Sequence, residues 1–241
     1  MPKSITQVKL RVLNLLCTDP ASQPEMFKRI KLPNLEGLRL ENEDFKQGWK
    51  LDIYLPILRQ APLLQFLTLS TYRSRIPLIG APPRHGLKHR AVPDREMTRF
   101  LKAIPSVVCL RLPLAININA FVVEELARGC YIPLLETLEL GSLHGEHIVE
   151  MIHRRNYLVE NTLLCSPVLG ETSAMGASGR HSSTEASTPI RRISRLNLSV
   201  EEDEQVLAYV HHSLRAYQGI SSETIEVHIT SHNPRLFYHP E

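Results

Sequence analysis

Aromatic side chains are scarce in this sequence, since phenylalanine, tryptophan and tyrosine make up only 6% of its 241 residues. The hydrophobic fraction is nevertheless 43%, an ordinary value for a globular protein, so most apolar residues are aliphatic. An apolar run of the ~18 residues that a membrane span requires is also missing, as is a leader with a small-residue cleavage site. We therefore expect an aliphatic core in an intracellular protein, cytoplasmic or nuclear, with no membrane as a partner.

A large excess of charge of one sign is missing as well. The net charge of +3 is small for this length, and nucleic-acid binders usually carry a strong basic excess on one face, so we expect no nucleic-acid partner. The four cysteines, Cys17, Cys109, Cys130 and Cys165, are far apart and form no C-x-x-C pair. We expect reduced thiols in core or strand positions and no disulfide framework.

The sequence contains no combination of residues typical of an enzyme. Both the phosphate-binding G-x-x-x-x-G-K-[ST] loop and the dinucleotide-binding G-x-G-x-x-G motif are absent, and residues 176–179 lack the second glycine of a nucleophile elbow. The histidine pairs, His85 with His89 and His144 with His147, have no further ligands at zinc-site spacing. We expect surface histidines, no catalytic residues, no metal and no cofactor.

A recurring pattern, L-x-x-L-x-L with aliphatic substitutions, is the main positive feature of the sequence. Its six copies have these aliphatic positions: Leu10, Leu13 and Leu15; Leu35, Leu38 and Leu40; Leu64, Leu67 and Leu69; Val107, Leu110 and Leu112; Leu135, Leu138 and Leu140; Ile193, Leu196 and Leu198. In four copies a proline stands two residues before the first aliphatic position, at Pro33, Pro62, Pro105 and Pro133. This shared register is hard to obtain by chance.

The spacing of the copies matches a known repeat length. Where copies follow one another directly, their last leucines are 25, 29 and 28 residues apart, close to the ~20–29 residues of leucine-rich repeats. Two longer intervals of 43 and 58 residues predict an insertion at about 72–93 and either a degenerate repeat or a long loop at about 165–190. The first insertion is basic and proline-rich, and residues 170–189 are of low complexity. We expect a single domain over residues 1–241.

Helical periodicity fills the intervals between the copies. We expect a short helix near Pro56, a second around Ile148, Met151 and Ile152, and a third over 206–217. Two more are expected after helix caps at Asp94 and Asn119. The side chains expected to be buried are Met97, Phe100, Leu101 and Ile104 after Asp94; Val122, Leu126 and Cys130 after Asn119; and Val206, Tyr209, Val210, Leu214 and Tyr217 in the helix over 206–217. Each x-L-x-L segment alternates as a strand does, and a last strand is expected at 224–230.

Strands that alternate with helices predict parallel strands on one side and helices on the other. Because no single unit can bury its apolar face alone, the units must stack. The expected fold is therefore α/β, an irregular leucine-rich-repeat solenoid with parallel strands on the concave side and helices on the convex side. The alternative is a non-repetitive α/β domain with a leucine-rich core.

The strands LPNLEGLRL, APLLQFLTL, IPSVVCLRL and IPLLETLEL resemble those of F-box-associated leucine-rich-repeat proteins of mushroom-forming fungi. The F-L-x-x-I-P segment at 100–105 and the I-V-E-M-I-x-x-R helix at 148–155 are similar in style. The resemblance implies repeats that select the substrate of an F-box-type ubiquitin ligase subunit. Since the first copy begins by Leu10, we expect no F-box ahead of the repeats. The F-box is the part that normally binds a Skp1-type adaptor in this family, so the resemblance leaves that partner in doubt.

Strand alternation predicts which side chains face a partner. It places Asn14, Arg39, Thr68, Arg111, Glu139 and Asn197 outward in one row, and Val12, Gly37, Phe66, Cys109, Thr137 and Arg195 in the adjacent row. The candidate partner-binding residues are Arg39, Phe66, Thr68, Arg111, Glu139, Arg195 and Asn197, because aromatic residues and arginines anchor interfaces. We therefore expect a protein-protein interaction module for an unknown protein substrate. A truncated remnant without function and an enzyme of unknown class are the alternatives.

Overall fold

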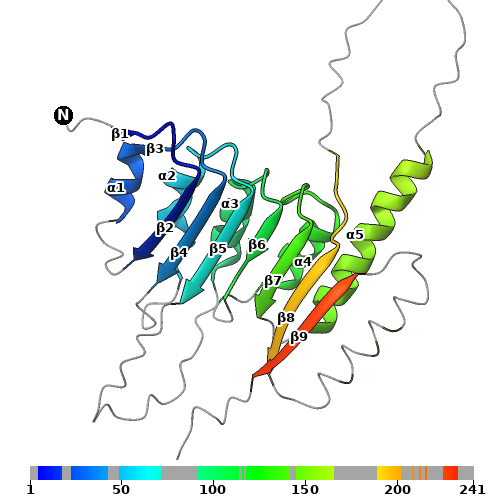
Figure 1. Cartoon of the computed structure of the whole chain (residues 1–241). Coiled ribbons are helices and arrows are strands. Elements are labelled where there is room, and N and C mark those ends of the chain that lie inside the picture. The colour runs from blue at the N-terminus through cyan, green and yellow to red at the C-terminus, as the bar shows by residue number, and fades with distance from the viewer. Residues whose placement is uncertain are drawn as a thin grey trace, which may run out of the picture.

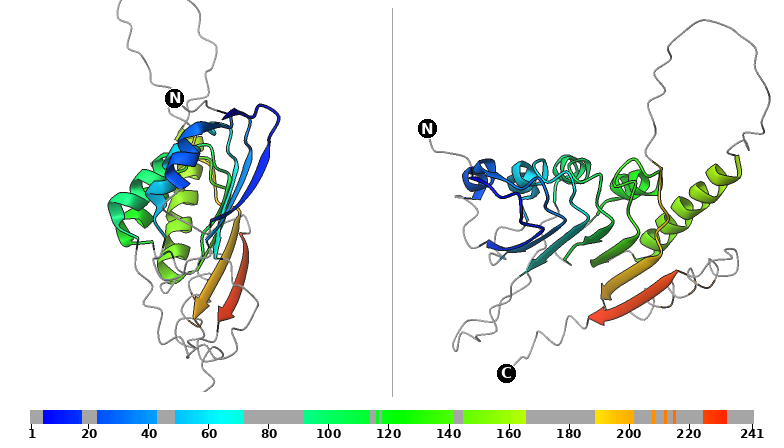
Figure 2. Two further views of the ribbon diagram at one scale, coloured as in Figure 1. Left: turned by 90° about the vertical axis from the view of Figure 1, so that its left-hand side faces the viewer. Right: turned by 45° about the horizontal axis from the view of Figure 1, so that its top comes forward.

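Seven parallel strands and the helices between them in the chain give this protein an α/β fold (Figure 1). The computed structural model describes residues 5–17, 23–42, 49–71, 92–113, 116, 118–141, 145–165, 189–201, 208, 212, 215 and 225–232. Within these residues the main helices pack together on one face of the sheet (Figure 2). The other face, here called the open face, is covered by none of the described helices. The predicted α/β class is confirmed.

The large sheet runs in chain order. Its strands are β2 (Val12–Cys17), β4 (Gly37–Asn42), β5 (Phe66–Thr71), β6 (Cys109–Arg111), β7 (Thr137–Gly141), β8 (Arg195–Glu201) and β9 (Glu226–His232). The helices are α1 (Gln23–Arg29), α2 (Leu55–Leu58) after a 3-10 turn (Leu51–Tyr54), α3 (Asp94–Lys102), α4 (Ala120–Ala127) and α5 (Gly145–Cys165). Two short strands, β1 (Ile5–Thr6) and β3 (Ile30–Lys31), form a separate parallel pair.

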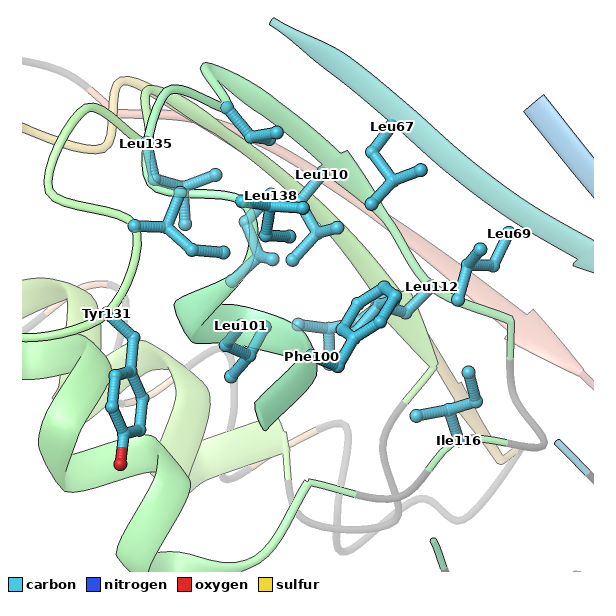
Figure 3. Close-up of a cluster of buried hydrophobic side chains, with 14 of the residues drawn as sticks. Leu67, Leu69, Phe100, Leu101, Leu110, Leu112, Ile116, Tyr131, Leu135 and Leu138 are labelled. Carbon is cyan, nitrogen blue, oxygen red and sulfur yellow. The ribbon is translucent and has the colours of Figure 1, made fainter. Parts of the chain in front are cut away.

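The aliphatic positions of the repeated pattern form the core. In the second to sixth copies every one of these side chains is at most 4% exposed. The leucines of the first copy are only partly buried, because β2 is an edge strand with a neighbour on one side. Figure 3 shows Phe100 and Leu101 of α3 packed against leucines of β5, β6 and β7.

Each of the four registered prolines occupies the second position of a tight turn. Backbone hydrogen bonds close these turns, from Leu35 N–H to Leu32 O (3.2 Å), Leu64 to Ala61 (3.1 Å), Val107 to Ile104 (3.2 Å) and Leu135 to Ile132 (3.1 Å). Proline is favoured at this position because its ring fixes φ near the value that the turn requires. The turn then directs the first aliphatic residue of each copy into the core.

Most of the predicted helices are present. Asn119 caps α4, since its side-chain Oδ1 accepts a hydrogen bond of 2.8 Å from the N–H of Val122. Pro56 lies in the first turn of α2, and α5 buries Ile148, Met151 and Ile152 as expected.

Two details of the helix predictions are wrong. Pro93, not Asp94, is the N-cap of α3, so Asp94 lies inside the helix, where its carboxylate favours the positive N-terminal end of the helix dipole. Cys130 is exposed because α4 ends before it.

The last predicted strand is present but shifted, since β9 begins at Glu226. The side chains predicted to be buried in a helix over 206–217 lie outside the described residues. Most of both predicted loops, residues 72–91 and 166–188, lies outside them as well.

Helix α4 ends at a glycine that no other residue can replace without strain. Gly129 has a φ of 70°, in the left-handed region that side chains disfavour. Its N–H donates to Leu126 O (3.1 Å) and the N–H of Cys130 donates to Glu125 O (3.0 Å), which is the bond pair of a Schellman motif. A Cβ at Gly129 would also lie 2.7 Å from Cγ1 of Ile190. Both the turn and the packing of the segment before β8 therefore require glycine here.

The side chain of Arg155 joins α5 to three other segments. It is fully buried, at 0% exposure. Its Nε donates to Arg191 O (2.9 Å), Nη1 to Leu126 O (2.8 Å), and Nη2 to both Ile132 O (3.0 Å) and Pro133 O (2.7 Å). The guanidinium therefore connects the end of α4, the turn before β7 and the segment before β8.

Asn156 extends this junction. Its Nδ2 donates to Ile193 O (3.0 Å) and its Oδ1 accepts from the N–H of Ile193 (2.9 Å). Burial lowers the pKa of Arg155 to about 10, which still leaves the guanidinium charged at neutral pH. The cost of burying that charge is offset by the four carbonyl oxygens that accept its hydrogen bonds.

Candidate binding face of the sheet

The strand register aligns both outward rows that the sequence predicts. Asn14, Arg39, Thr68, Arg111, Glu139 and Asn197 are successive partners from β2 to β8, and His228 of β9 continues the row. Val12, Gly37, Phe66, Cys109, Thr137 and Arg195 form the adjacent row, which Glu226 continues. All seven candidate residues, Arg39, Phe66, Thr68, Arg111, Glu139, Arg195 and Asn197, thus lie on the open face, either exposed or half-buried.

An apolar strip crosses the first three strands of the open face. It consists of Val12, Gly37 and Phe66, which are direct neighbours in the strand register. Val12 is 62% and Phe66 52% exposed. The Cγ atoms of Val12 lie 3.5 and 3.6 Å from the place of a Cβ on Gly37, so Val12 packs over the glycine. At its other end the strip exposes the aromatic ring of Phe66, a kind of side chain that anchors interfaces.

Two arginines stand beside the apolar strip in the adjacent row. Nε of Arg39 lies 2.6 Å from Oε1 of Glu41, and Nε of Arg111 lies 3.0 Å from Oε2 of Glu139. The arginine side chains are 52% and 50% exposed, whereas the side chains of Glu41 and Glu139 are 23% and 39% exposed. The positive groups therefore reach further into solvent than the carboxylates that neutralise them. Exposed pairs of this kind contribute only ~0–1 kcal/mol, so a partner's carboxylate can replace them.

The other half of the open face is polar. Asn197 Nδ2 donates to Glu139 Oε2 (3.2 Å), and Glu226 pairs with both Arg195 (2.7 Å) and His228 (2.8 Å). Hydrogen bonds from His228 and Arg195 hold the pKa of Glu226 below its usual value. Its carboxylate is therefore charged at neutral pH, and these groups join β7 to β8 and β8 to β9 by separate side-chain interactions.

Three residues that form ion pairs on this face were not singled out by the sequence analysis: Glu41, Glu226 and His228. Glu226 and His228 alternate along the predicted last strand, so extending the two rows by one strand would have found them. Glu41 lies two residues beyond Arg39 on the same strand, and alternation alone places both on the open face.

Within the described part of the chain, no group of three or more histidine, cysteine, aspartate or glutamate side chains is arranged to hold a metal ion. None of the described helices is both long and apolar enough to cross a membrane. Of the histidines considered as ligands, His147 is exposed on α5, while His85, His89 and His144 lie outside the described residues. Residues 176–179 lie outside them too.

Comparison of the chain with protein-family models, with curated proteins and with solved structures gives no match. The fold and the open face define an α/β protein with an exposed sheet surface that carries aligned side chains. The function has to be inferred from that surface.

The described cysteines differ in environment, which predicts an order of reactivity. Cys130 is exposed, Cys109 is half-buried on the open face and Cys17 is buried. Burial raises the pKa of the Cys17 and Cys109 thiols, and the thiolate is the reactive form. We expect iodoacetamide at neutral pH to alkylate Cys130 first and Cys17 last, as measured by mass spectrometry of the peptides. Equal rates in the folded chain would contradict these placements, and equal rates in urea serve as the control.

Proposed function

We propose that this chain is a protein-binding module, an irregular leucine-rich-repeat solenoid whose open face is the concave binding surface. The observation that carries the proposal is the alignment of side chains from seven strands in two rows on a face that no described helix covers. The strand order, which follows the chain, and the buried pattern in each copy support repeat stacking.

The chemistry of the face supports binding over catalysis. Three carboxylates whose side chains the structure describes on this face are engaged: Glu41 with Arg39, Glu139 with Arg111, and Glu226 with Arg195. A general base needs a carboxylate set against a substrate or a nucleophile. Exposed aromatic and arginine side chains, in contrast, are the residues that dominate protein interfaces.

A narrower version of the proposal rests on the resemblance of the repeated strands to fungal F-box-associated proteins. In that version the chain provides the substrate-recognition repeats of an F-box-type ubiquitin ligase subunit inside the cell. The protein substrate would then bind the open face.

Affinity capture of the tagged full chain from lysate of its native cells, with mass spectrometry, tests the proposal. The double variant Arg39→Glu, Arg111→Glu is expected to lose the proteins that the native chain captures. The control variant Arg59→Glu, Arg95→Glu changes the same number of charges at exposed positions of the helical side and is expected to keep them. Thermal melting followed by circular dichroism verifies that both variants fold.

Each outcome of the capture is informative. Partners that both double variants retain equally would contradict binding through the open face. Recovery of a Skp1-type adaptor and a cullin together with the partner would support the ligase version. A partner recovered without them would contradict the ligase version and support a stand-alone binding module.

A further inference from the structure

The apolar strip runs across the strands, and Leu16, 51% exposed on β2, adds a further apolar side chain to the open face. Val12, Gly37 and Phe66 are partners on β2, β4 and β5. Adjacent strands are about 4.8 Å apart, so β2 and β5, which carry the two exposed side chains of the strip, are separated by about 9.6 Å. A partner that covers the strip therefore has to present apolar groups at about this spacing along its own length.

An α-helix meets that spacing better than an extended peptide does. Apolar residues on one face of a helix recur about every 5.4 Å along its axis, so two turns differ from two strand spacings by only about 1.2 Å. Side chains on one face of an extended strand recur about every 6.7 Å, so its nearest spacings of about 6.7 and 13.4 Å differ from about 9.6 Å by roughly 3 and 4 Å. The spacing of the strip thus favours a helix that lies across the strands.

The charges beside the strip specify one flank of that helix. Arg39 and Arg111 lie on β4 and β6, with the small side chain of Thr68 between them on β5. Both guanidinium groups are about half exposed, and their carboxylate partners are less exposed than they are. A guanidinium binds a carboxylate through two parallel hydrogen bonds. An acidic side chain placed over Thr68 can therefore reach either arginine.

We propose that the open face receives an amphipathic α-helix of a partner protein, lying across β2 to β6. The apolar side of the helix covers Val12 and Phe66, and glutamate or aspartate residues along one flank pair with Arg39 and Arg111. This inference rests on the proposed function, because it names the class of partner that the same face binds.

The test uses the full chain and three synthetic peptides, with binding measured by fluorescence anisotropy. The first peptide is a helix with leucines at i, i+4 and i+7 and glutamates along one flank. The second has lysines in place of those glutamates. The third has the composition of the first but carries central prolines that prevent a helix. We expect the acidic helix to bind at least about tenfold more tightly than either of the others.

Matched variants locate the binding site. Phe66→Ala is expected to weaken binding of the acidic helix about tenfold, which corresponds to about 1.4 kcal/mol. Phe121→Ala is the control, since Phe121 of α4 is 55% exposed, close to the 52% of Phe66, but lies on the helical side. The Arg39→Glu, Arg111→Glu variant is expected to prefer the lysine peptide over the glutamate peptide.

Several results would overturn the inference. Equal binding of the proline peptide would assign the face to an extended segment, and equal binding of the lysine peptide would remove the role of the arginines. Absence of binding to all three would also reject it, as would self-association of the native chain that Phe66→Ala abolishes. Capture of cellular proteins that depends on Arg39 and Arg111, together with any of these failures, would reject the helix but leave the proposed function standing.

Discussion

Replacing Arg155 with methionine is expected to lower the free energy of unfolding by about 2–4 kcal/mol. Methionine fills much of the same volume but donates no hydrogen bond. Carbonyl oxygens of Ile132, Pro133 and Arg191 would lose the donors that Arg155 now provides in the interior. Ile132 O and Pro133 O would keep the backbone hydrogen bonds that they accept from Leu135 and Arg191. Arg191 O would lose the donor that Arg155 provides, and a buried acceptor without a donor costs about 1–3 kcal/mol. Loss of the other hydrogen bonds from the charged guanidinium adds to that cost.

Urea unfolding followed by far-ultraviolet circular dichroism measures this loss. The neighbouring residue provides a matched control, because Arg154 is 52% exposed and pairs with Glu124 and Glu150 on the surface. Arg154→Met is expected to cost less than about 1 kcal/mol. If the two variants unfold at the same urea concentration, Arg155 does not hold these segments together.

Gly129→Ala is expected to destabilise the chain by about 2–4 kcal/mol. The left-handed conformation, with a φ of 70°, costs a residue with a side chain about 1–2 kcal/mol. The added Cβ would also meet three side-chain carbons of Ile190 at 2.7 to 2.8 Å, closer than atoms in a packed core approach. Relief of that overlap requires the side chain of Ile190 or the segment before β8 to move, which adds about 1–3 kcal/mol.

A second glycine distinguishes strain from the general effect of adding a methyl group. A Cβ on Gly37 would have its nearest contacts with Val12, at 3.5 Å or more, so Gly37→Ala is expected to change stability by no more than about 0.5 kcal/mol. Combining Gly129→Ala with Ile190→Ala should restore the stability that is lost to steric overlap with Ile190. The cost of the left-handed backbone conformation at position 129 should remain. Equal stability of the two single variants in urea unfolding would contradict this account.

The sheet and its two outward rows could be predicted from the sequence because both depend on local order. Alternation decides which residues of a strand point out, and the recurring pattern marks equivalent positions of successive strands even where the intervals between copies differ. Arg39, Thr68 and Arg111 therefore become neighbours, although the sequence separates them widely. The prolines, which start each turn at the same place, reinforce this register.

The buried junction at Arg155 could not be predicted in the same way. Arg155 follows Ile148, Met151 and Ile152 at helical spacing, so the pattern places it on the buried side of α5. What makes its burial tolerable is the set of carbonyl oxygens from residues 126, 132, 133 and 191. Backbone carbonyls carry no signature in a sequence, so the pattern indicates the position without its partners.

The side-chain geometry of the open face could not be predicted from the sequence either. That Val12 packs over Gly37, and that Glu41 is less exposed than Arg39, depends on side-chain rotamers and on neighbours from other strands. The cap of α3 was missed for a related reason. Asp94 and Pro93 are both acceptable at a helix start, and only the backbone of Pro93, with ψ of 139°, shows where the helix begins.

The strand order of the large sheet has a consequence for how the chain opens. Every strand of that sheet pairs only with the strands of the same sheet that precede and follow it in the chain. Each strand is therefore stabilised mainly by its direct neighbours. Central strands are held on both edges, whereas β2 is held on one, with Leu13 and Leu15 only partly buried. Fraying therefore starts at the ends. A partner bound from β2 to β6 would hold β2 against the central strands. Its net binding free energy would then include the cost of keeping β2 in the sheet.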